Sequence, residues 1–344
     1  MVYLILAGSL CGLSDGIFLS WSSPFIVQIT QDKENYDIST EEASYFTTIP
    51  WIGFIIGCPV FAFLADKIGR KRTYFFTALL HLLAYLFAAF ASDIYLFYTS
   101  RICFGLASSC YYAVFPIYIG EIANPEVRGR WGNAVASSIY LGGLLVNILG
   151  SYLNVSWTSY VCIPLPLLFL LLFNAMPESP YYLVMKGYED EAKQALRFFT
   201  RKTDVDNDYF ILKMDVERQL SESGTFRDLF TIDSNRRALI AGVFLRVSQI
   251  SSGLMIVFMF TQSIFQISGS EIDHGLLSII LMAANFGLNL LVLVFIVHRF
   301  SRKKLFVISS SHAGIVMFLL ENLRTGDVSF TARMPATKTT GAAK

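Results

Sequence analysis

Charged residues are scarce in this sequence. Asp, Glu, Lys and Arg make up 15% of its 344 residues, whereas apolar residues make up 54%, and the mean hydropathy is +0.53. A soluble domain has more charge and fewer apolar residues, so this class is excluded. The net charge of +1 gives no overall positive field for binding nucleic acid. The composition predicts a protein that crosses a membrane several times.

Metal ligands and reactive groups are also few. The five cysteines and four histidines are scattered, and His81 lies in an apolar run without a second ligand at metal spacing. No nucleophile and base stand at a recognisable spacing, and no glycine loop is of the phosphate-binding kind. We therefore expect no metal, no cofactor and no enzymatic activity.

Long apolar runs are what the sequence does contain. A helix needs about 20 mainly apolar residues to cross the hydrocarbon core. Nine stretches fit this requirement: Val2–Trp21, Tyr45–Ala65, Thr73–Ala91, Tyr95–Ile119, Trp131–Leu153, Tyr160–Met176, Leu239–Ile267, Gly275–Val297 and Leu305–Leu320. The runs are continuously apolar rather than alternating, which favours helices over the strands of a β-barrel. The predicted fold class is an all-α polytopic membrane protein.

The connections between these stretches alternate in charge. One set is basic and holds Lys67, Arg70, Lys71, Arg72, Arg128, Arg130, Arg299, Arg302, Lys303 and Lys304. The other set is acidic apart from Lys33. Basic connections lie on the cytoplasmic side of a membrane, so we expect the N-terminus in the cytoplasm.

One long polar stretch, residues 177–237, separates the first six spans from the last three. Its apolar residues recur at helical spacing, which predicts short amphipathic helices on the cytoplasmic side with a break at Gly187. We divide the chain into a first membrane part (1–176), this linker (177–237), a second membrane part (238–320) and a polar tail (321–344).

The segment LADKIGRKRTYFF, which starts at Leu64, has a weaker counterpart in IVHRFSRKKLFVI, which starts at Ile296. A repeat at this distance fits a duplicated bundle of helices, an arrangement that alternating-access transporters use. A second copy of six spans is expected, whereas three are found, and the tail 321–344 has no run that could cross a membrane. Two explanations stay open: the tail is foreign to the chain, or the protein is a natural short form.

Charged side chains gather at the cytoplasmic ends of several spans. They are Asp66, Arg70 and Lys71 after the second span, Glu121 at the end of the fourth, Arg128 before the fifth and Glu178 after the sixth. Each exposed ion pair contributes about 0–1 kcal/mol, enough to bias an equilibrium between two conformations. The alternative is that these residues only anchor loops at the membrane surface.

Four motifs in this order, LADKIGRKR, YIGEIANPEVRGR, PESPYYL and SQISSGLMIVFMFTQSIF, resemble the sugar porter family of the major facilitator superfamily, in particular its insect facilitated trehalose and sugar transporters. The resemblance covers residues 1 to 320 and implies a major-facilitator helical bundle, with about nine of twelve transmembrane helices present. It implies an inner gate motif of Asp66, Arg70 and Lys71. It also implies cytoplasmic salt-bridge positions at Arg101, Glu121, Arg128 and Glu178, which in the family hold the outward-facing state.

A sugar site needs amide and hydroxyl groups that converge in an apolar cavity. The candidate residues are Gln249, Asn147 and Gln262. The family pattern implies further contacts that this sequence lacks. Ile250 and Met255 stand at a glutamine and an asparagine of the seventh-helix motif, and Ala136 stands at a glutamine of the fifth helix.

Two charged residues inside spans have open interpretations. Asp15 is a candidate proton carrier, because proton-coupled members of the family have an aspartate in the first helix; the alternative is that it neutralises Arg101, a cation inside the fourth span. Arg246 is a candidate contact for an anionic or unusual substrate, or it snorkels toward the cytoplasmic edge.

These observations predict a facilitative transporter of the plasma membrane. It moves a sugar, a mono- or disaccharide such as trehalose or glucose, by alternating access, and its partners are this small solute and the lipid bilayer. Three alternatives are kept: a truncated, non-transporting protein or regulatory partner, a transporter of a non-sugar organic solute, and a proton-coupled sugar symporter.

Overall fold

The computed structural model describes residues 2–122, 125–221, 224–225, 227–296, 299, 301 and 303–315, and side chains within these ranges except at 2–5 and 125–134. Within this part of the chain, every regular element is a helix. The predicted all-α class is therefore confirmed. The tail 321–344 and the end of the predicted span Leu305–Leu320 lie outside the described residues, whereas residues 303–315 are helical.

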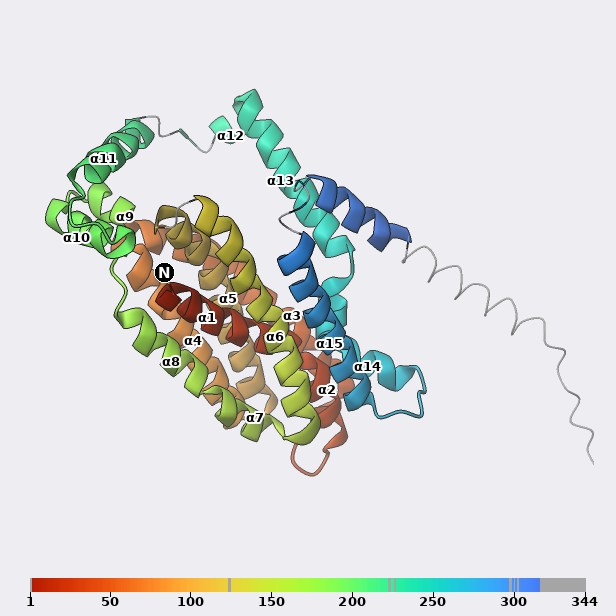
Figure 1. Ribbon diagram of the computed structural model, residues 1–344. Coiled ribbons are helices and arrows are strands. Elements are labelled where there is room, and N and C mark those ends of the chain that lie inside the picture. Colours follow the sequence, from red (N-terminus) through yellow and green to blue (C-terminus); the bar gives the residue numbers. More distant parts are fainter. Residues whose placement is uncertain are drawn as a thin grey trace, which may run out of the picture.

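The first part of the chain is a bundle of long helices (Figure 1). Its elements are α1 (Val2–Ser20), α2 (Ser22–Gln31), α3 (Thr40–Ile68), α4 (Arg70–Ala89), α5 (Ile94–Ile122), α6 (Pro125–Tyr152), α7 (Val155–Cys162) and α8 (Pro164–Asn174). Four short helices follow: α9 (Pro180–Met185), α10 (Glu189–Thr200), α11 (Asp206–Ser221) and α12 (Asp228–Thr231). The last elements are α13 (Asp233–Ser251), α14 (Leu254–Ile267), α15 (His274–Leu291) and the π-helix η1 (Val292–Ile296).

Seven helices in the described residues are long and apolar enough to cross a membrane, and the pair α1 and α2, bent by 41°, makes up to eight. They coincide with eight of the nine predicted spans. The ninth is the stretch that lies partly outside the described residues. The chain is thus a multi-pass integral membrane protein.

Local sequence explains where several helices begin. Ser39 and Glu42 form a capping box at the start of α3: the Glu42 backbone N–H donates to Ser39 Oγ at 3.2 Å, and the Ser39 N–H donates to the Glu42 carboxylate at 2.9 Å. Pro164 occupies the first turn of α8, where its missing N–H costs nothing. Gly253 separates α13 from α14 with a φ of +75°, a conformation that glycine adopts without strain.

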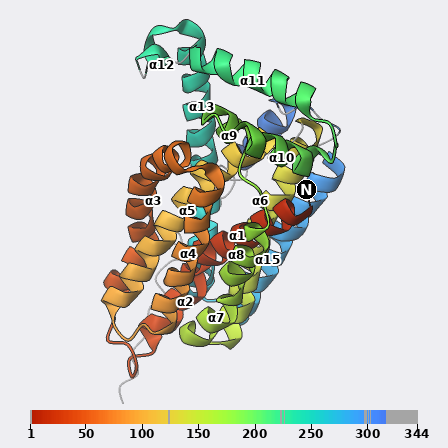
Figure 2. The ribbon, with the colours of Figure 1, turned by 90° about the vertical axis from the view of Figure 1, so that its left-hand side faces the viewer.

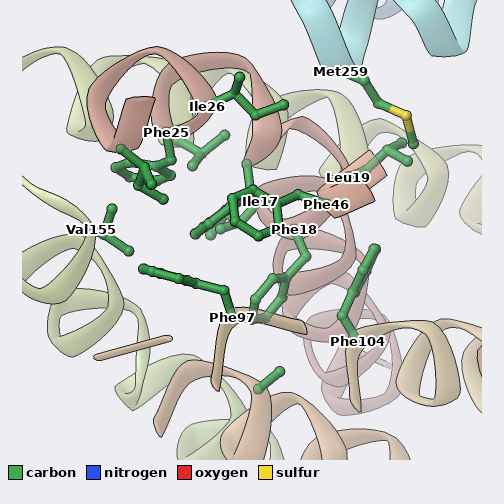
Figure 3. Packing of buried hydrophobic residues seen from close by; sticks show 14 of the residues in the cluster. Ile17, Phe18, Leu19, Phe25, Ile26, Phe46, Phe97, Phe104, Val155 and Met259 are labelled. Atoms are coloured by element: carbon green, nitrogen blue, oxygen red, sulfur yellow. The ribbon is translucent and has the colours of Figure 1, made fainter. Parts of the chain in front are cut away.

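The bundle core is rich in aromatic rings. Figure 3 shows Phe18, Phe97 and Phe104 within one buried cluster that also contains Phe25 and Phe46. Such rings bury large apolar areas and pack edge-to-face or offset, which here joins α1 and α2 to α3 and α5.

Helices α1 and α6 approach closely at two glycines. A Cβ atom on Gly16 would meet the Ile139 carbonyl, and one on Gly142 would meet the Leu13 carbonyl. Small residues at such contacts let backbones touch, which is how helices associate in a membrane. These glycines therefore fix the spacing of α1 and α6.

The two ends of the bundle differ. Helices α9, α10 and α11 lie at one end, and α7 lies at the other (Figures 1 and 2). We call these the Arg70 end and the Asn154 end. Helices α14 and α15 contact α2 and α6, whereas α13, which extends toward the Arg70 end in Figure 1, has no buried residue.

Candidate functional site

A group of charged residues at the Arg70 end is organised around the side chain of Arg70, which is 4% exposed. Its guanidinium donates to Asp66 Oδ1 at 2.9 Å, to both Glu121 carboxylate oxygens at 2.9–3.1 Å and to the Ala65 carbonyl at 3.0 Å. These charge-assisted bonds join the end of α3 and the start of α4 to the end of α5. We call Asp66, Arg70, Lys71, Glu121, Glu178 and Ser179 the Arg70 cluster.

Glu178 extends the Arg70 cluster to the segment after α8. Its Oε1 accepts from the backbone N–H of Lys71 at 2.8 Å, at the first turn of α4, where N–H groups lack helical partners. A carboxylate there is also favoured by the helix dipole. The Lys71 ammonium donates to the Asn174 carbonyl at 2.9 Å, and Ser179 Oγ donates to Glu121.

Gly69 makes this cluster possible. It is the single residue between α3 and α4 and has a φ of +108°. A Cβ atom at this position would meet the Glu178 carboxylate, and L side chains rarely adopt this conformation. The glycine of the LADKIGRKR motif is therefore required by both backbone and space.

The two ion pairs of Arg70 differ in burial. The side chain of Glu121 is 12% exposed, whereas that of Asp66 is 69% exposed. Breaking a buried pair leaves an uncompensated charge at a cost of about 3–5 kcal/mol, whereas an exposed pair contributes about 0–1 kcal/mol. The Arg70–Glu121 pair is therefore the main ionic contact of the cluster.

The structure brings together five of the seven predicted gate residues, namely Asp66, Arg70, Lys71, Glu121 and Glu178. The side chain of Arg128 lies outside the described residues. Arg101 is a correction to the prediction: it lies 20 residues before Glu121 on α5, about 30 Å away at the helical rise. This separation can be read from the sequence itself, because Arg101 lies near the start of the fourth span and Glu121 lies at its end.

Arg101 is instead buried near the Asn154 end, with 1% of its surface exposed. Its Nη1 donates to the Phe18 carbonyl at 3.1 Å, and its Cζ lies 4.1 Å from the centre of the Trp21 ring. Aromatic faces stabilise a cation in this way.

Asp15 on α1 is 2% exposed and does not pair with Arg101. Its two carboxylate oxygens accept from Ser108 Oγ and, at 3.2 Å, from the Tyr112 hydroxyl. The alternative that Asp15 neutralises Arg101 is therefore wrong as a direct ion pair, because no salt bridge joins the two side chains and Asp15 bonds to hydroxyl groups of α5 instead.

Two of the three predicted sugar contacts lie together between the first and last parts of the chain. Asn147 on α6 accepts from Ser23 Oγ at 3.1 Å and donates to Ser20 Oγ at 2.9 Å. Ser23 Oγ also accepts the backbone N–H of Gln262 on α14 at 3.1 Å. The Gln262 amide nitrogen lies 3.3 Å from Ser278 Oγ and 3.4 Å from Ser151 Oγ. We call Ser20, Ser23, Asn147, Ser151, Gln262 and Ser278 the polar seam.

Gln249, the third predicted contact, lies elsewhere. It is exposed on α13, and its amide oxygen accepts from Arg246 Nη1 at 2.6 Å. The structure therefore does not bring the three amides to one place, and Asn147 and Gln262 have protein partners.

Sequence reasoning missed the serines of the polar seam. Ser20 donates to the Phe258 carbonyl at 2.8 Å, which ties α1 to α14. On α6, Ser137 donates to Asn289 of α15 at 2.6 Å. A signal was available, because Ser20 and Ser23 interrupt an apolar run three residues apart, and small polar residues at such spacing join helices in membranes.

A polar cleft of about 850 Å³ opens at the Asn154 end. Among its lining residues are Gln28, Asp32, Tyr36, Ser151 and Asn154. Ser151 also belongs to the polar seam, so the cleft reaches the contact between α6 and α14. No group of three His, Cys, Asp or Glu residues in the described part of the chain could hold a metal.

Known proteins share this architecture. The chain is 31% identical to the facilitated trehalose transporter Tret1 of Polypedilum vanderplanki over 92% of its length, and 29% identical to that of Culex quinquefasciatus over 97%. It spans 63% and 66% of the lengths of these two relatives.

A solved structure of the major facilitator superfamily proton:xylose symporter XylE, bound to 6-bromo-6-deoxy-D-glucose, superposes with a TM-score of 0.72 at 23% identity. The superposition covers 88% of this chain and 70% of that one. The inward-open form of XylE from E. coli gives a TM-score of 0.65. The chain thus has the major-facilitator fold that its motifs predicted.

The family described as sugar (and other) transporter matches residues 5–332, which is most of the chain. The order of the motifs, the Arg70 cluster and the fold agree with this match. The protein belongs to the family described as sugar (and other) transporter, and its fold is that of the major facilitator superfamily.

Proposed function

We propose that this protein moves a sugar, a mono- or disaccharide such as trehalose or glucose, across a membrane by alternating access. The observation that carries the proposal is an asymmetry between its ends. The polar seam joins the first part of the chain to α14 and α15, whereas α13 has no buried residue as it extends toward the Arg70 end (Figure 1). Contact between the two parts at one end is what one state of an alternating-access cycle requires.

The relatives support the choice of solute. Two of them are named facilitated trehalose transporters, and the superposed symporter is bound to a glucose derivative. A facilitative cycle needs only the solute gradient, and we favour it here. The basic connections support a cytoplasmic N-terminus, and we propose that the plasma membrane holds the protein.

Uptake into vesicles tests the proposal. The purified protein, reconstituted in liposomes, should take up at least one of labelled trehalose, glucose and fructose faster than empty liposomes, with saturation and with inhibition by the unlabelled sugar. A matched preparation of Asp215→Asn, which alters only an exposed ion pair on α11, should behave like the wild type. Equal uptake of all three sugars by liposomes with and without the protein would refute sugar transport.

Proton coupling is a separate alternative and rests on Asp15. A carboxylate inside a span is expensive unless it has a function or partners, and Asp15 has two hydroxyl partners but no cation. For a facilitator, an inward proton gradient leaves the initial uptake rate unchanged. For a symporter, the gradient raises that rate, and Asp15→Asn abolishes the increase.

A second candidate solute is anionic, and Arg246 favours it. Arg246 lies in the spanning helix α13, and its partner is the uncharged Gln249. An intramembrane cation without a carboxylate suits a solute that has one. Glucuronate uptake that exceeds glucose uptake, and that Arg246→Gln selectively removes, would establish this candidate.

A further inference from the structure

The side chain of Arg101 lies in a cage of aromatic rings inside the first bundle. Its Cζ is 4.1 Å from the centre of the Trp21 ring, 5.0 Å from that of Phe18 and 5.5 Å from that of Phe104. Figure 3 shows Phe18 and Phe104 as part of the buried cluster. The cage excludes solvent, since Arg101 and Trp21 are 1% and 2% exposed.

The cage lacks a negative charge. Among the described residues, no carboxylate lies within ion-pair distance of Arg101, and both oxygens of Asp15 accept from Ser108 and Tyr112 instead. A buried, unpaired charge is costly in a protein interior and more so within a membrane. Aromatic faces offset only part of this cost.

Several hydrogen-bond donors in the cage also lack partners. The Phe18 carbonyl accepts from Arg101 Nη1, whereas Arg101 Nε and Nη2 and the indole Nε1 of Trp21 have no partner in the described structure. His81, whose ring stacks on Phe18 at 5.9 Å, has both ring nitrogens unpartnered. Guanidinium and indole nitrogens can only donate, and a neutral imidazole has one N–H to give. Tyr85, whose ring centre lies 4.4 Å from that of Phe18, also has an unpartnered hydroxyl, so the cage offers a positive charge, N–H donors and an O–H group that can donate or accept.

We propose that the Arg101 cage is a binding site for one small monovalent anion, of the size and charge of chloride. The anion would accept from Arg101 Nε or Nη2 and from Trp21 Nε1, and it would neutralise the buried guanidinium. A water molecule would satisfy some of these donors but would leave the charge uncompensated. The site uses none of the residues of the polar seam and does not depend on the identity of the transported solute.

Thermal unfolding tests the site directly. The purified protein in detergent, kept in gluconate buffer at constant ionic strength, should show a saturable rise in its unfolding midpoint as chloride or bromide replaces gluconate, since a ligand that binds only the folded state stabilises it. Arg101→Gln should remove the rise. Arg218→Gln, which deletes an exposed cation on α11, is the matched control and should keep it.

A second variant and readout cover the case in which Arg101→Gln fails to fold. Trp21→Phe keeps an aromatic ring but removes the indole N–H, so more chloride should be needed for half of the rise in unfolding midpoint.

Iodide should quench a saturable part of the tryptophan fluorescence in the wild type, and chloride should compete with this quenching. Trp21→Phe should lack the saturable part. The proposal would be overturned if the unfolding midpoints were equal in chloride and gluconate. It would also be overturned if iodide quenching stayed linear and insensitive to chloride. Buried water would then be the partner of Arg101.

Discussion

The Arg70 cluster and the polar seam hold helices together with different chemistry. The Arg70 cluster uses full charges, and its partners all belong to the first part of the chain and the segment that follows α8. The polar seam uses neutral amides and hydroxyls, and it joins the first part to α14 and α15. Charge-assisted bonds are about twice as strong as neutral ones. The stronger contacts thus lie within one bundle, and the weaker ones join the two parts that the proposed transport cycle would have to separate.

The largest effect is expected from Glu121→Ala. The change leaves the Arg70 guanidinium buried without its main counter-charge, which should lower the free energy of unfolding by about 3–5 kcal/mol. Asp66→Ala is the matched control on the exposed side of the same guanidinium and should cost about 0–1 kcal/mol. Denaturant unfolding of both purified variants measures the difference. Equal losses of unfolding free energy would show that the burial of Glu121 does not make its pair with Arg70 stronger than that of Asp66.

A smaller but still large effect is expected from Gly69→Ala. The alanine would have a positive φ, a strain of about 1–3 kcal/mol, and its Cβ would also displace the Glu178 carboxylate from the start of α4. Gly187→Ala is the control, because Gly187 has a φ of +80° but no atom within 4 Å of the added Cβ. The thermal unfolding midpoint of Gly69→Ala should be lower than that of Gly187→Ala. The reverse order would show that the contact of Glu178 with the start of α4 does not contribute to stability.

The polar seam should show intermediate effects that do not add. Asn147→Ala or Gln262→Ala leaves buried partners unsatisfied at a cost of about 1–3 kcal/mol each. Ser23 Oγ donates directly to the Asn147 side chain, so the double variant Ser23→Ala/Asn147→Ala should deviate from the sum of its single variants by about 0.5–3 kcal/mol, whereas Gln262→Ala keeps the backbone N–H that bonds Ser23. A double-mutant cycle on unfolding free energies measures this coupling. Strict additivity would mean that the seam is not one network.

The smallest effect is expected at Lys193 on α10, which binds Glu189 and Asp206 at 2.9 Å on an exposed surface. The hydrogen bond from Lys193 lowers the pKa of Asp206 below its ordinary value of 3.8. This stabilisation is present above the ordinary pKa and is lost as the pH falls through the lowered one. Lys193→Met should therefore lower the free energy of unfolding slightly at neutral pH and low salt. The difference from the wild type should vanish in strong acid and in high salt, which unfolding measured at several pH values and salt concentrations can check.

Sequence reasoning worked best where charges mark the ends of apolar runs. Asp66, Arg70, Glu121 and Glu178 lie within a few residues of span ends, so their meeting at one membrane face follows from the order of the spans. It failed for Arg101 because a charge near the start of the fourth span was grouped with the charges at its end, and because nothing in an apolar run marks which way a side chain faces. It missed Ser20 and Ser23 because a serine in an apolar run looks like a tolerated interruption until a partner helix is placed beside it.

The contact of α1 with α6 has a consequence for the membrane itself. Where Gly16 and Gly142 bring the two backbones together, a Cβ atom on either glycine would overlap a carbonyl group of the other helix, so no water molecule fits between the helices at these two points. A hydrated ion therefore has no path between α1 and α6 there.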